Sequence, residues 1–223
     1  MDATSGEEMK FYTETVPRKT KKALDFLSAE LWIAKSGWYL AGGTALALQA
    51  GHRKSIDLDF FTTKSKFNSE TVLRNFSGNS EWHTSFDEDN TIYGALFGAK
   101  ASFIAYPFFV PQQKYIKYGR VNVLQKRDIA VMKIVAISQR GKKRDFFDLF
   151  WCAHHVEPLI EIIKRLPVQY PSVAHDYHHI LKALVYFDDA ESDPDPEVDF
   201  DADWKTVKNF FQKEIPLIMD KLI

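Results

Sequence analysis

Hydrophobic positions follow two different spacings along the chain. In the first half, short apolar runs end at glycines or turn residues, which predicts strands over residues 38–41, 56–61, 81–86, 91–97 and 101–106. Residues 20–32 and 68–76 have helical spacing instead, and Asn68 or Ser69 is placed to cap the second helix. This alternation predicts a mixed sheet with flanking helices.

After residue 125 the spacing is helical throughout. The pattern predicts helices over residues 127–138, 144–154, 159–165, 173–186 and 204–223, the last interrupted by Pro216. We therefore expect an α+β chain with two domains. A mixed α/β domain would occupy residues 1–125, and a helical domain over residues 126–223 would contribute to the active-site cleft.

Composition narrows the location of the protein. Apolar residues make up 45% of the chain and charged residues 26%, which is typical of globular proteins. No apolar stretch is long enough to predict a membrane span. The single cysteine, Cys152, excludes an internal disulfide, and residues 1–8 are polar and acidic, unlike a secretion signal. We expect a cytoplasmic protein with no membrane partner.

A strand, a glycine turn and a helix follow one another near residue 40. The apolar run 38–41 meets Gly42 and Gly43, and helix-forming residues continue to a stop at Gly51. Glycines let a phosphate approach the backbone, and a helix N-terminus offers free N–H groups. Thr44 is predicted to cap this helix and to add a hydroxyl. The segment thus predicts a phosphate-binding turn.

Two aspartates on the next predicted strand form the strongest candidate for chemistry. Asp57 and Asp59 are two residues apart, so their side chains would share one face of the strand. Adjacent carboxylates repel each other unless one is protonated or a cation lies between them, and oxygen ligands suit Mg²⁺ or Mn²⁺. A phosphate-binding turn followed by such a pair is typical of phosphoryl or nucleotidyl transfer. Each fragment alone is also common as a plain turn or strand edge.

Two motifs resemble those of a known family. Residues 39–48 (YLAGGTALAL) with 53–60 (RKSIDLDF) resemble the first motif of the AbiEii/AbiGii-type nucleotidyltransferase toxins, within the DNA polymerase β-like superfamily. Residues 128–137 (DIAVMKIVAI) with 140–149 (RGKKRDFFDL) are similar to the family's later lysine-containing helix and Arg-Asp-x-x-Asp-Leu motif. The resemblance implies a nucleotidyltransferase-like sheet.

The same resemblance implies a role for each matched residue. Asp57 and Asp59 would bind the metal, Lys133 would reach a phosphate or the nucleotide, and Asp148 is the possible base. The residues that would contact substrate are Gly42, Gly43, Thr44, Arg53, Ser55, Arg144 and Asp145. Other interpretations stay open: the two later aspartates also suit a helix N-terminus, and the lysine a solvated helix face.

One departure from the superfamily divides the functional hypotheses. A third metal-binding carboxylate usually lies on a later strand, but residues 100–106 contain no acid. The first hypothesis is an enzyme that transfers a nucleoside monophosphate from a nucleoside triphosphate to an acceptor such as tRNA. The resemblance would make it the toxin of a toxin–antitoxin or phage-defence system, with a cognate antitoxin as partner. The alternative is a catalytically weak or inactive nucleotide-binding module.

The charge is separated along the chain although the net charge is only −1. Residues 114–144 hold ten Lys and Arg and one acid, whereas residues 188–203 hold nine acids and no Lys or Arg. The basic segment suits either a nucleic-acid backbone or a solvated linker. The acidic segment is predicted to be an exposed loop, to cover the basic face, or to contact an antitoxin.

Overall fold

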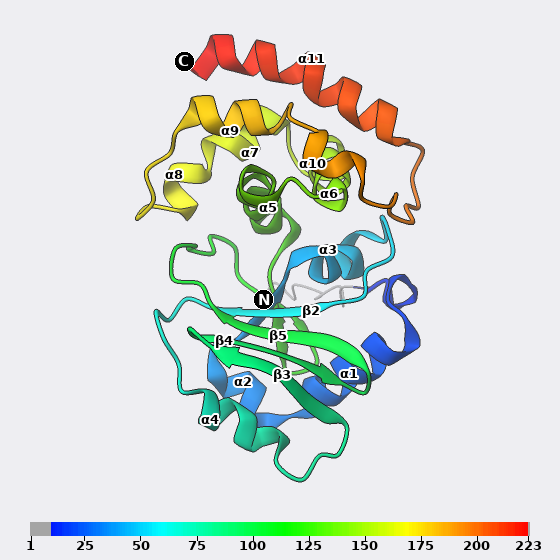
Figure 1. The fold of residues 1–223 in the computed structure, drawn as a ribbon, viewed down its shortest axis with the longest axis vertical. Coiled ribbons are helices and arrows are strands. Elements are labelled where there is room, and N and C mark those ends of the chain that lie inside the picture. The colour runs from blue at the N-terminus through cyan, green and yellow to red at the C-terminus, as the bar shows by residue number, and fades with distance from the viewer. Residues whose placement is uncertain (1–9, 223) are drawn as a thin grey trace, which may run out of the picture.

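The residues that this computed structural model describes, 10–222, form a mixed sheet of seven strands (Figure 1). Residues 1–8, whose composition supported the predicted location, lie outside the described part. The spatial order is β3-β4-β5-β2-β1-β7-β6. The strands are β1 (Tyr39–Ala41), β2 (Leu58–Thr62), β3 (Trp82–Glu88), β4 (Thr91–Leu96), β5 (Ala99–Ala105), β6 (Ile116–Tyr118) and β7 (Val121–Val123).

Helices lie on both faces of the sheet, with α1, α2 and α4 on one side and α3 with the C-terminal helices on the other (Figure 1). The predicted α+β class is confirmed. The helices are α1 (Arg18–Ala29), α2 (Leu31–Ser36), α3 (Gly42–Ala50), α4 (Ser69–Leu73), α5 (Lys126–Arg140), α6 (Lys143–His155), α7 (Leu159–Lys164), α8 (Leu166–Gln169), α9 (Tyr177–Ala183), α10 (Asp188–Glu191) and α11 (Trp204–Leu222), with single 3₁₀ turns η1 (Thr13–Thr15) and η2 (Arg74–Phe76).

The pairing of the central strands positions the glycine turn. β1 runs antiparallel to β2 and places Ala41 opposite Asp59. β5 runs parallel to β2 and places Ser102 opposite Asp59 on the other side. Because α3 begins directly after Ala41, its first turn starts beside the Asp59 carboxylate. The register of three strands therefore brings together segments that are far apart in the sequence.

All five predicted strands are present, but two more were missed. β6 and β7 form an antiparallel hairpin, and β7 pairs in parallel with β1. Each of these strands has only three residues. Lys117 lies within β6 and Arg120 in the turn that follows it, and the remaining residues include polar groups, so no local pattern predicts these strands. Pairing with the buried strand β1 stabilises them instead. The predicted strand over 56–61 was also too long at its start, because β2 begins at Leu58.

The helix predictions fail at three positions. The predicted helix 20–32 breaks at Glu30, whose extended backbone separates α1 from α2. Pro216 does not interrupt α11, whose buried residues on both sides of the proline hold the helix against the core. α3 begins at Gly42, so Thr44 lies inside the first turn and does not cap it. In addition, the short helices α8 and α10 were not predicted, and the helix predicted over 173–186 is shorter, at Tyr177–Ala183. Two helix-end signals are confirmed: Asn68 caps α4 through the Thr71 N–H, and Gly51, with φ +70°, ends α3.

The two halves share one cluster of buried apolar side chains. This cluster includes Phe60 and Phe103 of the sheet and Phe146 and Phe211 of the helical half. The sheet ends at Val123 and α5 begins at Lys126, so the predicted boundary at 125/126 falls in their connection. Two separate domains with that boundary stay a prediction. Within residues 10–222, no helix is long and apolar enough to cross a membrane.

Candidate active site

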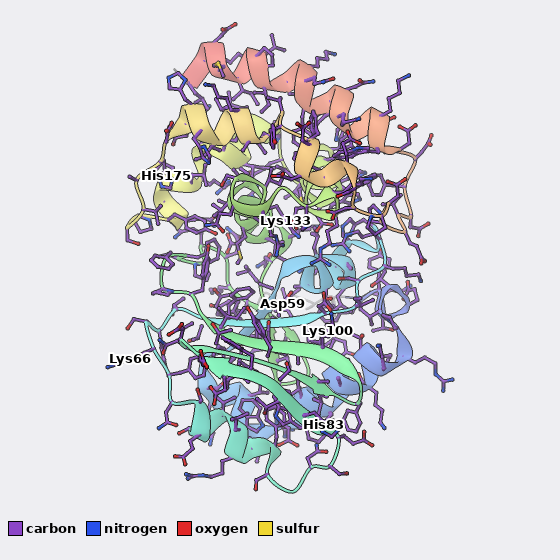
Figure 2. The ribbon with its side chains drawn as sticks, in the orientation of Figure 1. Asp59, Lys66, His83, Lys100, Lys133 and His175 are labelled. Atoms are coloured by element: carbon purple, nitrogen blue, oxygen red, sulfur yellow. The ribbon has the colours of Figure 1, made fainter. Side chains whose placement is uncertain are left out.

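A cavity of about 440 Å³ lies between the sheet and helices α5 and α6. Figure 2 shows Asp59 on the sheet side and Lys133 on the helical side. Eight of the eleven residues predicted for the site line this cavity: Gly42, Gly43, Arg53, Ser55, Asp57, Asp59, Lys133 and Arg144. The fold therefore brings the two sequence motifs to one place, although Asp59 and Lys133 lie 74 positions apart in the chain.

The Asp57 and Asp59 carboxylates face the cavity with few partners. Asp59 Oδ1 accepts a 2.8 Å hydrogen bond from the Ser102 hydroxyl. Burial raises the pKa of Asp59 above its ordinary value, and the nearby Asp57 charge adds to that rise. Asp57 Oδ1 is buried and has no hydrogen-bond partner among the described residues, and Oδ2 lies 3.7 Å from Arg144 Nη1. The negative charge of the pair is thus compensated only in part, by the long contact with Arg144.

Close contacts explain why two glycines precede this pair. Gly42 has a φ of +69°, and a Cβ there would lie 3.1 Å from Asp59 Oδ2. A Cβ on Gly43 would lie only 2.3 Å from Arg53 Nη2. The turn is glycine because Asp59 and Arg53 approach its backbone. Both glycines also line the cavity. The predicted approach of a phosphate to this turn stays a prediction.

Arg53 is held by a buried carboxylate from the helical half. Its Nε and Nη2 donate to the two oxygens of Asp148 at 2.6 and 2.8 Å. The His52 Nε2 lies 2.7 Å from the same carboxylate. Burial would raise the pKa of Asp148, but the Arg53 and Lys133 charges hold it well below its ordinary value. Asp148 is therefore an ionised group that orients Arg53.

Lys133 occupies the helical wall of the cavity in a second set of ion pairs. Its Nζ lies 2.6 Å from both Asp145 Oδ1 and Asp148 Oδ2. Burial opposes its charge, yet these two carboxylates raise the pKa of Lys133 above its ordinary value. Arg140 also contacts Asp145, with Nη2 2.9 Å from Oδ2. The lysine is fixed in position with its charge compensated, so it is not the solvated helix lysine of the alternative interpretation.

The three other predicted residues lie behind the cavity lining. Thr44 is buried, and its hydroxyl donates to the Asp57 carbonyl and lies 2.9 Å from Ser55 Oγ. Asp145 and Asp148 are fully buried in the ion pairs with Lys133 and Arg53. The hydrogen bond from the Thr44 hydroxyl holds the Asp57 backbone in position. The predicted substrate contacts of Thr44 and Asp145 and the base role of Asp148 stay predictions.

The position expected to hold a third carboxylate carries a hydroxyl. Ser102 is the β5 residue opposite Asp59, and it is the partner of that carboxylate. Among residues 10–222, no group of three or more His, Cys, Asp or Glu side chains is arranged to hold a metal. The carboxylates from this chain at the cavity are therefore the two aspartates, with Ser55 also in the lining and Ser102 bonded to Asp59.

Sequence reasoning missed the aromatic wall of the cavity. Its rings are those of Phe61, Tyr93, Tyr106 and Tyr170, drawn from β2, β4 and two loops. The rings of Phe61 and Tyr106 meet edge to face with centroids 5.7 Å apart. Alternation along β2 already places Phe61 on the face of Asp59, which is the one signal the sequence offered. Such a wall suits the flat face of a nucleobase.

Ion pairs engage more than half of the cations in the basic segment, and most of these cations stay about half exposed. Six of its ten cations form ion pairs: Arg127, Lys133, Arg140, Lys142, Lys143 and Arg144. Lys142 pairs with Asp193 at 3.1 Å and Lys143 with Asp195 at 3.0 Å. The acidic segment thus covers part of the basic face. Of the three arrangements predicted for this segment, this one is confirmed.

Comparisons with known proteins agree with this geometry. A family model described as "Nucleotidyl transferase AbiEii toxin, Type IV TA system" matches residues 25–92 and 90–221. An uncharacterised protein of Aquifex aeolicus is 37% identical over 182 residues, covering 80% of this chain and 86% of its own length.

Two solved structures match this chain at low sequence identity. A candidate nucleotidyltransferase from H. pylori is 20% identical, with a TM-score of 0.53, and the match covers 92% of this chain and 97% of that one. The nucleotidyltransferase toxin MenT4 of Mycobacterium tuberculosis is 15% identical with a TM-score of 0.41, over 92% and 95% of the two chains. The first of these supports the nucleotidyltransferase-like sheet.

Proposed function

This chain belongs to the AbiEii nucleotidyltransferase toxin family, and on that premise we propose that it transfers a nucleoside monophosphate from a nucleoside triphosphate to an acceptor. An acceptor oxygen would form a bond to the α-phosphorus while the bond to pyrophosphate breaks. The observation that carries the proposal is the Asp57 and Asp59 pair, which faces a cavity of nucleotide size with an unpartnered carboxylate oxygen.

The two aspartates fit a divalent cation. Asp57 Oδ1 is buried without a partner among residues 10–222, and two like charges at one cavity favour a further counter-charge from outside the chain. Asp57 and Asp59 would hold Mg²⁺ or Mn²⁺, with Ser102 fixing the orientation of Asp59. A bound cation would neutralise triphosphate charge and favour attack at phosphorus.

The residues around the pair would hold the rest of the nucleotide. The N-terminal turn of α3 presents backbone N–H groups at Gly42 and Gly43, where negative phosphate oxygens are favoured. Arg144 is half-exposed and only loosely paired with Asp57, so it is free to contact a phosphate. The aromatic wall of the same cavity would pack against the base.

Asp148 acts in this proposal as a positioning residue. Its carboxylate is buried and engaged by Arg53, His52 and Lys133, and its low pKa makes it a weak base. Its role would be to fix Arg53 against Gly43 and Lys133 in the cavity wall. This differs from the role of base that the motif implied.

The family supports a biological setting for the same activity. We propose an RNA acceptor such as tRNA, a cognate antitoxin partner and a cytoplasmic location. A second candidate function is a weak or inactive nucleotide-binding module, and Ser102 in place of a third carboxylate favours it.

Labelled nucleotide separates these two functions. The purified protein is incubated with each α-³²P-labelled nucleoside triphosphate, Mg²⁺ and total RNA. We expect label on RNA from wild type and a loss of at least ~10²-fold in Asp57→Asn. Asp199→Asn, on an exposed loop, is the matched control. Nucleotide binding without transfer in all conditions would favour the binding module, and full transfer by Asp57→Asn would contradict the metal assignment.

A further inference from the structure

A second hollow, of about 550 Å³, opens beyond the end of β2 on the other face of the sheet. Alternation along β2 places Asp59 and Phe61 towards the active site, whereas Thr62 lines the second hollow. The two cavities share no lining residue among those described. Figure 2 shows Lys66 of this region at the edge of the molecule, apart from Asp59 and Lys133. A ligand here would not compete with nucleotide.

Four cations from three segments surround this hollow. Lys35 belongs to α2, Lys64 and Lys66 to the loop that follows β2, and Arg74 to η2. All four are exposed, and none forms an ion pair with any described residue. No acidic side chain lines the hollow within residues 10–222. Four like charges gathered without a counter-ion create a local positive potential that attracts polyanions.

The floor of the hollow is aromatic. Trp32, Trp38 and Phe67 line it, with the last two rings edge to face at 5.0 Å. The hollow thus combines cations and aromatic rings.

We propose that this hollow binds single-stranded nucleic acid. Phosphates would contact the four cations, and an unstacked base would pack against the aromatic floor, the combination found in single-strand binding sites. An isolated phosphate ion would use the cations and leave the rings without a role. A duplex keeps its bases stacked and would leave the floor empty. All four cations of the site lack an ion pair with the described residues, whereas six of the ten cations in segment 114–144 form one.

The test measures binding directly, without nucleotide or metal, so it does not depend on the proposed transfer. Fluorescence anisotropy of the full-length protein in EDTA uses a labelled 12-mer as RNA, as DNA of the same sequence, and as a duplex. The variant Lys64→Gln/Lys66→Gln removes two exposed charges. The control Lys205→Gln/Lys213→Gln removes two exposed, unpaired charges from α11, at the far end of the molecule.

We expect the hollow variant to bind single strands about tenfold more weakly at low salt, with a salt slope smaller by about 1.4, whereas the control and Asp57→Asn bind as wild type. Tighter binding of single strands than of duplex supports the proposal, and the ratio of RNA to DNA affinity identifies the preferred sugar. Equal affinity of the hollow variant and wild type would overturn it. Equal binding of duplex, or no binding of any oligonucleotide, would do the same.

Photocrosslinking gives a second, independent measurement. Single-stranded RNA carrying 4-thiouridine is irradiated with the protein, and the attached peptides are identified by mass spectrometry. Crosslinks within residues 32–38 or 62–75 support the proposed site. Crosslinks confined to residues 114–144, or to the cavity around Asp57, would place the nucleic acid elsewhere and overturn the inference.

Discussion

Two pairs of aspartates lie on opposite sides of the active-site cavity, and their surroundings differ. Asp145 and Asp148 are fully buried, and Lys133 lies 2.6 Å from an oxygen of each. Asp57 and Asp59 have a serine hydroxyl and one distant arginine, and one carboxylate oxygen has no partner among the described residues. The first pair is closely paired with cations of the protein, and the second has only one long contact with a cation.

The difference shows how the same residue type serves two purposes. A buried carboxylate that is paired and hydrogen-bonded fixes its cationic partners, and its removal leaves their charges buried without a counter-charge. A carboxylate pair that faces a cavity without a close counter-charge favours a cation from solution. Asp145 and Asp148 thus belong to the architecture of the site, and Asp57 and Asp59 to its proposed chemistry.

The largest expected effect is on stability when the pair Asp145 and Asp148 is broken. Asp148→Ala leaves the Arg53 guanidinium buried without its bidentate partner, so we expect the free energy of unfolding to fall by about 3–5 kcal/mol. Denaturant unfolding measures this change. Glu161→Ala, which removes an exposed ion pair with Lys164, should change it by less than ~0.5 kcal/mol. Equal effects of the two substitutions would contradict the conclusion that Asp148 is the buried partner that stabilises Arg53.

The next expected effect is a loss of stability in acid. In the folded protein, the charges of Lys133 and Arg140 hold the pKa of Asp145 below its ordinary value. The charges of Arg53 and Lys133 do the same for the pKa of Asp148. The contribution of these two carboxylates to the free energy of unfolding is therefore complete above the pKa of about 3.9 that they have in the unfolded chain. It is lost as the pH falls through the lower pKa values that they have in the folded protein. The stability gap between wild type and Asp148→Asn should narrow from pH 6 to pH 3. A constant gap would show that this carboxylate is not held ionised.

A smaller effect is expected when a cation reaches the pair Asp57 and Asp59. At Mg²⁺ ten times its dissociation constant, the free energy of unfolding should rise by about 1.4 kcal/mol, because only the folded site binds the ion. Asp57→Asn should abolish this gain and leave the metal-free stability close to that of wild type. Asp220→Asn on α11 should keep the full gain. Stabilisation of Asp57→Asn by Mg²⁺ would place the ion elsewhere.

The smallest expected effect concerns the single hydrogen bond that orients Asp59. Ser102→Ala removes the donor to Asp59 Oδ1, and we expect a cost of about 1 kcal/mol in unfolding free energy. Ser85→Ala, which removes an exposed 3.2 Å bond to the Tyr93 carbonyl, should cost less than ~0.5 kcal/mol. Equal costs in denaturant unfolding would mean that the bond to Asp59 carries no particular weight.

Local patterns predicted much of the fold, and together with the family resemblance they predicted eight of the eighteen residues that line the cavity. The Gly42–Gly43 turn and the Asp57–Asp59 pair were recognisable because their signals lie within a few residues of one another. The hairpin β6–β7 and the serine opposite Asp59 were not, because pairing with a distant strand creates both. The unpaired cations around Lys64 escaped notice because they come from three separate segments.

The sequence by itself determined the order of helices and strands, the glycine turn, and the presence of two aspartate pairs within family motifs. Only the tertiary structure decided which pair is closely paired with cations. Arg53 and Asp148 are 95 residues apart in the chain yet share a bidentate contact. Charge compensation depends on distances of a few ångströms in a low-dielectric interior, and the chain reaches those distances only when the sheet and the helices pack together.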